Sequence, residues 1–322
     1  MLATDEPGKP IVGIPRALLY YEYQAFWKKY LEMLGATVVV SPPTNRLILD
    51  EGVKLSCDES CLPTKVYCGH ASQIAKRVQY LFAPRIVSVR PKEYTCPKLL
   101  GLPDMLRPIL TQDTSLLSPV LDLTWQRSSL YKACLDVARG MQIRADKVPP
   151  ALACACVAQA REHRRRRAKP VGSSRNAVGC GLRVGVIGHS YLLEDESLNL
   201  GVTRMLRECG VSELLTEHSL RPSSVERASC GLGKPLFWTF EKRVAGSAMC
   251  FIRDRLVDGI IQVVSFGCGP DSMVASLIQS HASHAKMPYM MLTIDEHTGE
   301  VGIRTRIEAF CDMLRWTVKA SI

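Results

Sequence analysis

The sequence predicts an α/β protein made of two doubly wound domains, each built on a parallel sheet. Short apolar runs alternate with helical segments, and this alternation starts again after a Gly/Ser-rich stretch at residues 171–181. With 322 residues, 47% of them apolar, the chain is long enough for two domains with their own cores. We expect an N-terminal domain at residues 1–126, a helical, basic linker region at 127–180 and a C-terminal domain at 181–322.

The N-terminal domain opens with a β-α-β unit, which favours a parallel sheet. A strand at residues 9–14 comes before an amphipathic helix at 20–34 that Gly35 ends, and a second strand follows at 36–41. A helix that connects two strands in this way is typical of parallel pairing. A short helix is expected next, at residues 44–52.

The rest of this domain is predicted from its apolar runs and prolines. Residues 53–78 are expected to contain a strand end, a loop and a helix. A strand at 80–89 leads into a loop at 90–98, and a strand at 116–123 completes the sheet. A helix-like segment at 127–167 then leads to the domain boundary.

The C-terminal domain repeats the same order of elements. An apolar strand at residues 182–188 ends directly before His189. The segment 234–240 is interpreted as a strand or an extended segment. The remaining predictions are strands near residue 214 and at 259–266 and 288–296, and helices at 199–209, 241–256, 271–285 and 305–318.

Composition and charge exclude several classes of protein. No apolar run approaches the roughly 20 residues of a membrane helix, and the N-terminal sequence lacks a secretory pattern, so we expect a cytoplasmic protein without membrane association. The net charge is +10, and part of it lies in a basic run at residues 161–169. This run is interpreted as a solvated linker face. Nucleic-acid binding is not favoured, because no zinc-finger, helix-turn-helix or RNA-binding pattern accompanies it.

The chain has 13 cysteines, and three of them follow predicted strands: Cys61, Cys96 and Cys268. Ligands of an open α/β fold gather beyond the carboxyl ends of its strands, and thiolates ligate iron. Proline follows Cys61 and Cys96 closely, and Cys268 lies between glycines. The pattern predicts a shared metal site, against the alternative of scattered core cysteines. Seven others are interpreted as small packing residues: Cys134, Cys154, Cys156, Cys209, Cys230, Cys250 and Cys311.

Three further polar residues lie near predicted strand ends. His70, His189 and Glu296 are candidates for proton donors or substrate contacts. Each is equally consistent with a hydrogen-bonded loop residue, which we favour. The sequence contains no nucleotide-binding P-loop and no Cys-x2-Cys pair of a zinc ribbon.

Long motifs identify a family resemblance. The segments GIPRALLYYEY, VVVSPPTN, CDESCLPTKVYCGH, PRIVSVRPKEYTCPKLLGLPDM, LFWTF, VSFGCGPDS and TIDEHTGEVGIRTRIEAF resemble the activase-related branch of the 2-hydroxyacyl-CoA dehydratase superfamily. The resemblance implies two Rossmann-like domains with a cluster cleft between them. It also implies a [4Fe-4S] cluster held by Cys61, Cys96 and Cys268, with a double-cubane cluster as the disfavoured alternative. Cys57 and Cys68 match no ligand position of the family.

The resemblance also implies an activity and its partners. An ATP-hydrolysing iron–sulfur activator, acting in trans, would deliver low-potential electrons, and this chain would use them to reduce or dehydrate a small substrate such as an acyl-CoA. We therefore expect a lyase- or reductase-type enzyme or enzyme subunit, in a dimer. The alternative is a non-catalytic accessory protein that carries the cluster or transfers electrons.

Overall fold

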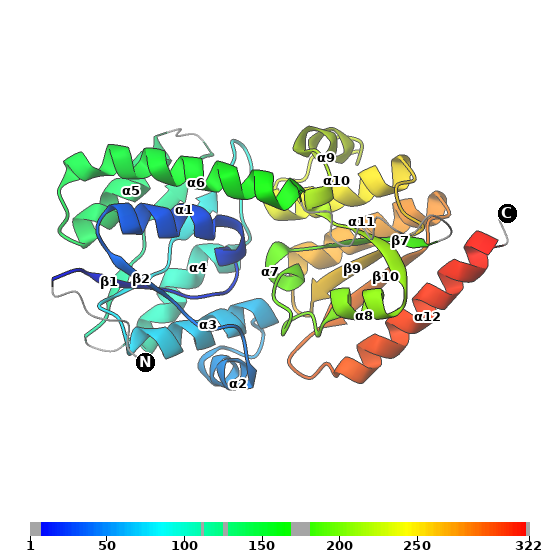
Figure 1. Cartoon of the computed structure of the whole chain (residues 1–322), viewed down its shortest axis with the longest axis horizontal. Helices are drawn as coiled ribbons and strands as arrows, with labels where there is room; N and C mark the ends of the chain where they lie inside the picture. The colour runs from blue at the N-terminus through cyan, green and yellow to red at the C-terminus, as the bar shows by residue number, and fades with distance from the viewer. Residues whose placement is uncertain (1–7, 111–112, 125–127, 169–180, 320–322) are drawn as a thin grey trace. The chain divides into compact units, whose positions relative to one another are not determined.

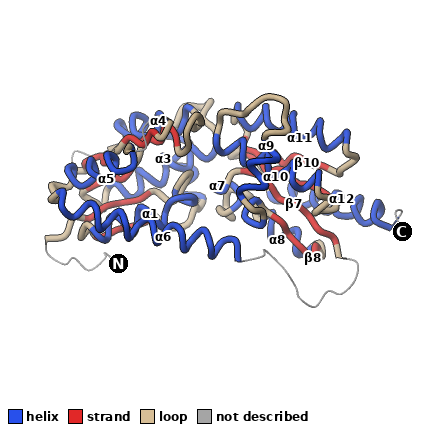
Figure 2. The backbone as a smooth tube through the Cα atoms, turned by 90° about the horizontal axis from the view of Figure 1, so that it is seen from above, coloured by secondary structure: helices blue, strands red, loops and turns tan. Residues whose placement is uncertain are grey.

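The structure, a computed structural model, describes residues 8–110, 113–124, 128–168 and 181–319. It divides into two compact units, Met1–Arg164 (the first unit) and Arg165–Ile322 (the second unit). Each unit contains a four-stranded sheet in which every strand pair is parallel, with helices beside the strands (Figures 1 and 2). The predicted α/β class, with parallel strands, is confirmed.

The first unit contains six short strands and six α-helices within its described residues. The elements are β1 (Ile11–Ile14), α1 (Tyr20–Met33), β2 (Thr37–Val40), α2 (Arg46–Leu55), α3 (Leu62–Ala75), β3 (Tyr80–Phe82), β4 (Arg85–Ser88), α4 (Pro97–Leu106), β5 (Ser115–Leu117), β6 (Val120–Asp122), α5 (Ser129–Gly140) and α6 (Val148–Ala168). Single 3-10 turns lie at Arg107–Ile109 and Ala145–Lys147.

The strand order of the main sheet is β2-β1-β3-β5. The chain therefore leaves β1 toward β2 on one side and returns to β3 on the other. This makes the gap between the carboxyl ends of β1 and β3 the topological switch point, where open parallel sheets bind ligands. The α1 helix ends as predicted at Gly35, whose φ of 93° lies in the left-handed region that glycine adopts easily.

Two predicted strands are each broken in two by a proline. The prediction for residues 80–89 is wrong as one strand, because Pro84 separates β3 from β4, and the prediction for 116–123 fails in the same way at Pro119. Proline has no N–H with which to continue a ladder. The breaks match each other, since β3 pairs with β5 in the main sheet while β4 pairs with β6 in a separate two-stranded sheet.

The segment before Cys61 contains no strand end, contrary to our prediction. Instead α2 continues to Leu55, and a turn leads directly to α3. The Asn45 side chain begins α2 by accepting a hydrogen bond from the Ile48 N–H at 3.1 Å. The two helices then pack at backbone contact, because Gly52 and Gly69 face each other without side chains. This packing, rather than a strand, leads the chain to Cys61.

Helices α5 and α6, which belong to the segment predicted as a helical, basic linker region, contribute to the core of the first unit. Cys134 on α5 and Val148 on α6 are fully buried against Tyr30 of α1, whose hydroxyl donates to the Cys134 carbonyl oxygen at 2.6 Å. The boundary between the units falls within α6, after Arg164. The Gly/Ser-rich boundary predicted at 171–181 lies outside the described residues except for Gly181, as does Lys169 of the basic run.

The second unit is built on the strand order β10-β9-β7-β8. The chain leaves β7 toward β8 and returns to β9 on the opposite side, so the switch point lies between β7 and β9. The elements are β7 (Leu182–Gly188), α7 (Ser190–Leu193), α8 (Val202–Glu208), β8 (Val211–Leu215), α9 (Pro222–Ser229), α10 (Thr239–Arg253), β9 (Gly259–Ser265), α11 (Gly269–His284), β10 (Tyr289–Ile294) and α12 (Glu300–Lys319), with a 3-10 turn at Glu217–Ser219.

The core of the second unit lies around β9, all seven of whose residues are buried. Phe251 of α10 and Ile278 of α11 pack in the same cluster as Ile260. Residues 234–240 form no strand, so the extended alternative holds up to Trp238, where α10 begins. Within the described residues, none of the helices combines the length and the apolar character needed to cross a membrane.

Candidate functional site

The three cysteines predicted as ligands each begin a helix. Cys61, Cys96 and Cys268 are the N-cap residues of α3, α4 and α11, and a proline occupies the first or second position of each helix. Their backbones are extended, and no side chain caps the free N–H groups of the first turn. Such a turn favours a negative charge at this position, although at Cys268 burial outweighs the effect and raises the pKa of the thiol to about 11. The sequence predicts helices after Cys61 and Cys268 but places Cys96 in a loop, so the helix that starts at Cys96 is a finding of the structure.

The cysteines belong to different units. Cys61 and Cys96 lie in the first unit and Cys268 lies in the second. The Cys61 sulfur is 3.2 Å from the Thr64 hydroxyl oxygen, which shares the first turn of α3. Cys96 follows the β4 strand by a loop, and Cys268 follows β9 by a tight turn in which its N–H donates to the Ser265 carbonyl oxygen at 3.2 Å. Ligation of one cluster by all three sulfurs stays a prediction.

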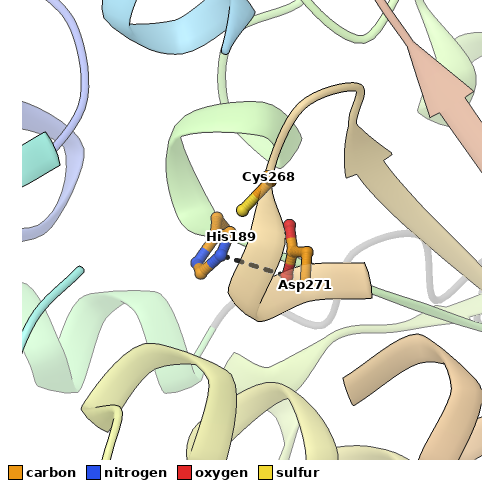
Figure 3. Close-up of side chains that lie close together, drawn as sticks. All are labelled: His189, Cys268 and Asp271. Carbon is orange, nitrogen blue, oxygen red and sulfur yellow. Dashed lines mark ion pairs between the residues drawn. The ribbon is translucent and has the colours of Figure 1, made fainter. Parts of the chain in front are cut away.

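A buried cluster surrounds Cys268 at the switch point of the second unit (Figure 3). His189 follows the carboxyl end of β7, and its Nε2 lies 3.1 Å from Asp271 Oδ1 and 3.8 Å from Glu241 Oε1. The ligand atoms of His189, Cys268 and Asp271 all lie within 4.8 Å of one another. The structure thus brings the predicted residues His189 and Cys268 together with two acids that the sequence did not single out.

The cluster holds ionisable groups almost out of contact with water. The side chains of His189, Asp271 and Glu241 are 3%, 1% and 2% exposed. Burial by itself would lower the pKa of His189, but Asp271, Cys268 and Glu241 raise that pKa well above its usual value. Burial also raises the pKa of Glu241. The arrangement therefore favours an imidazolium held between acidic groups.

The thiol and the carboxylates of this cluster retain donor capacity for another group. Burial raises the pKa of Cys268 to about 11, although the neighbouring His189 lowers it. Both carboxylate oxygens of Asp271 and Oε2 of Glu241 lack hydrogen-bond partners, and the 3.1 Å ion pair of His189 Nε2 does not have hydrogen-bond geometry. Unsatisfied buried atoms are costly, and once His189 and Cys268 lose their protons, the nitrogen, sulfur and oxygen atoms of this cluster suit a transition-metal ion.

Local structure explains the orientation of His189. Its ring stacks on that of Tyr191, with 4.8 Å between ring centroids and 14° between ring planes. Gly188, with a φ of 155°, leads the chain out of β7, and a Cβ there would lie 2.6 Å from the Val263 carbonyl oxygen. The imidazole is thereby held over the start of α11.

Asp271 and Glu241 have the same local position, which sequence reasoning overlooked. Each is the third residue of its helix, in α11 and α10. An acid in the first turn is an ordinary helix-start signal, because it complements the positive end of the helix. Nothing in either segment alone distinguishes a cluster residue from such a charge.

His70 is a hydrogen-bonded core residue of the first unit. Its Nδ1 lies 2.9 Å from Ser41 Oγ and its Nε2 lies 3.0 Å from Thr44 Oγ1, which ties α3 to the loop after β2. The side chain is fully buried. Burial and, to a smaller extent, the charge of Arg16 lower the pKa of His70 to about 4. This geometry agrees with the hydrogen-bonded alternative that we favoured.

The low pKa of His70 makes the stability of the first unit depend on pH. The folded state keeps His70 neutral, whereas in the unfolded chain His70 takes up a proton below pH 6.5. The first unit therefore keeps its full stability above pH 6.5 and loses the contribution of His70 as the pH falls toward 4. The expected loss is about 3 kcal/mol of unfolding free energy. Urea unfolding at several pH values measures it.

Two variants separate His70 from other sources of acid lability. A His70→Gln variant is expected to lose this part of the pH dependence, whereas His284→Gln, at an exposed position of α11, is expected to keep it. An equal pH slope in the parent and His70→Gln would contradict the assignment.

Glu296 lies in the turn between β10 and α12 and is half-buried. The neighbouring Asp295 organises this turn, because its carboxylate accepts hydrogen bonds from the His297 N–H at 2.9 Å and the Thr298 hydroxyl at 2.7 Å. These bonds, that of Thr298 first, lower the pKa of Asp295. Glu296 does not belong to the group formed by His189, Cys268 and Asp271.

The other described cysteines differ in exposure, and Cys154 and Cys209 are half-buried. Cys134, Cys250 and Cys311 are buried, as a packing role requires. That interpretation is wrong for Cys156 and Cys230, which are exposed because they lie on the solvent side of α6 and at the end of α9. Cys57 is exposed, with its sulfur 3.0 Å from the Ser60 hydroxyl oxygen, while Cys68 is buried and burial raises its pKa.

Comparison with known proteins gives one informative match. A family model described as a CoA enzyme activase uncharacterised domain matches residues 11–220, which is more than half of the chain. The matched part includes Cys61, Cys96 and His189 and ends before Glu241, Cys268 and Asp271. No curated protein matches the chain. A crystal structure of ZnuA covers 94% of this chain and 98% of its own, but at 9% identity and a TM-score of 0.28 it carries no argument.

Proposed function

The chain belongs to the family of the CoA enzyme activase uncharacterised domain, and from this premise we propose that it is an iron–sulfur protein of an activase-dependent system. It accepts low-potential electrons from an ATP-hydrolysing iron–sulfur activator in trans and reduces or dehydrates a small substrate such as an acyl-CoA. Cys61, Cys96 and Cys268 are its iron ligands. The observation that carries the proposal is that each of these thiols begins a proline-containing helix.

The donor set suits an iron–sulfur cluster. All three thiols are free of disulfides, and each lies at a helix N-terminus, whose free N–H groups favour the negative charge of an iron–sulfur cluster. Cysteine thiolates are the usual ligands of [4Fe-4S] clusters. The unsatisfied atoms of Asp271 and Glu241 beside Cys268 further mark this part of the second unit as built around a group that the residues themselves do not supply.

The chemistry divides between the cluster and the chain. A [4Fe-4S] cluster with three protein ligands supplies one-electron transfer and, at its fourth iron, a Lewis acid for a small molecule. Cys268 would bind iron, and the ligand atoms of His189 and Cys268 lie within 4.8 Å of each other. Hydrogen bonds to ligating sulfurs adjust the reduction potential of a cluster. Asp271 and Glu241 orient the imidazole and balance its charge.

The test is iron and acid-labile sulfide analysis of protein purified without oxygen, together with EPR spectroscopy. We expect about four irons and four sulfides per chain, and an EPR signal that acyl-CoA esters perturb. An unperturbed signal would point to the accessory role, and about eight irons to a double-cubane cluster.

Two outcomes would overturn the proposal. One is the absence of iron after anaerobic reconstitution. The other is about one metal ion per chain that is lost in Asp271→Ala but kept in Cys61→Ala, which would indicate a single-ion site of His189, Cys268 and Asp271.

A further inference from the structure

The first unit contains a partly open, mostly apolar pocket at its own switch point. The pocket holds about 490 Å³ of space, its mouth included. Ile14 and Pro15 line it from the end of β1, and Phe82 and Pro84 line it from the end of β3. It therefore lies between the carboxyl ends of the two strands where the strand order reverses. This is the position at which open parallel sheets bind ligands.

The wall of the pocket combines apolar surface with a few polar tips. Trp27 of α1 and Leu102 of α4 are among its apolar walls, while Tyr20, Tyr23 and Tyr67 contribute phenol rings. Small-molecule sites have this composition, with apolar walls that supply affinity and a small number of polar groups that orient the ligand. The helices that begin at Cys61 and Cys96 both contribute to the wall.

Backbone strain is stored at the same place. Leu18 lines the pocket, is 3% exposed and has a φ of 51°, in the left-handed region. The left-handed conformation destabilises a leucine by roughly 1–2 kcal/mol. Strained residues persist where the surrounding structure fixes them, and they cluster at ligand sites.

A cation next to the pocket in the chain, Arg16, does not itself line the pocket, but its charge acts on Tyr20, which does. Arg16 stands between two lining residues, Pro15 and Ala17, and its N–H donates to Ser41 Oγ at 2.8 Å. Its Nε is buried without a hydrogen-bond partner, and among the described residues no carboxylate pairs with its guanidinium. Its charge acts on both Tyr20 in the wall and His70 behind it. His70 is neutral and hydrogen-bonded, so it does not balance this charge.

We propose that this pocket binds a small monocarboxylate with an apolar tail, the tail lying in the pocket and the carboxylate on Arg16. A guanidinium is the side chain best suited to a carboxylate, because its N–H groups match the two oxygens. The apolar wall excludes ligands whose tail is charged. The site uses neither Cys61, Cys96 nor Cys268, so it does not depend on the proposed cluster.

The experiment is isothermal titration calorimetry on the full chain, without metal, using hexanoate as the probe. Hexanoate is expected to bind, whereas acetate, which lacks the tail, and hexanol, which lacks the charge, bind at least about tenfold more weakly. Arg16→Gln is expected to weaken hexanoate binding at least about tenfold and leave hexanol unchanged. Arg46→Gln, at an exposed position of α2, is the matched control and keeps the parent affinity.

A second variant tests the tail site. Ala17→Leu adds volume to the wall and is expected to weaken hexanoate and hexanol together. Equal binding of hexanoate by the parent and Arg16→Gln, or no heat with any probe, would overturn the proposal. The calorimetry uses metal-free protein, so its result is independent of the iron analysis. Absence of hexanoate binding would not alter the iron content, and absence of a cluster would not alter hexanoate binding.

Discussion

A Cys268→Ala variant, purified without oxygen, is expected to fall from about four irons per chain to below about one and to lose its visible absorbance. The reason is that the variant removes a thiolate ligand from a buried site, where the neighbouring His189, Asp271 and Glu241 offer no second sulfur. Cys61→Ala and Cys96→Ala are expected to give the same loss, because both thiols begin helices in the same way. Iron analysis and absorbance spectroscopy measure the effect.

Matched controls come from cysteines outside the predicted ligand set. Cys57→Ala, four residues before Cys61, and Cys156→Ala, exposed on α6, are expected to keep the full iron content. Thermal unfolding of every variant shows whether the fold is retained. The ligand assignment fails if Cys61→Ala, Cys96→Ala and Cys268→Ala all keep their iron.

Gly69→Ala is expected to destabilise the first unit by about 3 kcal/mol or more. A Cβ at this position would lie 2.0 Å from the Ile48 carbonyl oxygen and 3.0 Å from the Gly52 nitrogen. Both atoms belong to the backbone of α2, so no side-chain movement relieves the clash and the two helices must separate. Because α3 begins at Cys61, the same change displaces a predicted ligand. Chemical denaturation of parent and variant measures the loss.

Gly101→Ala is the control for this prediction. Gly101 lies in the middle of α4, and a Cβ there would meet nothing within 4 Å. Alanine favours a helix interior over glycine, so this variant is expected to gain up to about 1 kcal/mol. A stability of Gly69→Ala equal to that of the parent would show that α2 and α3 do not pack at backbone contact.

Much of the element order was predictable because its signals are short-range. The apolar runs of β7 and β9, the glycine that ends α1, and the prolines after Cys61 and Cys96 act over a few residues. The breaks at Pro84 and Pro119 carried a local signal too, but their effect depends on which strand each segment pairs with. That pairing is a property of the sheet, not of either segment.

The sequence by itself determined the α/β class, the helices that follow Cys61 and Cys268, and the relation to an activase family. Only the tertiary structure decided which side chains meet. His189, Glu241 and Asp271 come from the end of a strand and the first turns of two helices, and the order of parallel strands brings them together. That packing buries all three side chains, and burial raises the pKa of Glu241, while the neighbouring acidic groups raise the pKa of His189 against the effect of burial. Burial depends on residues distant in the chain, and no local pattern encodes it.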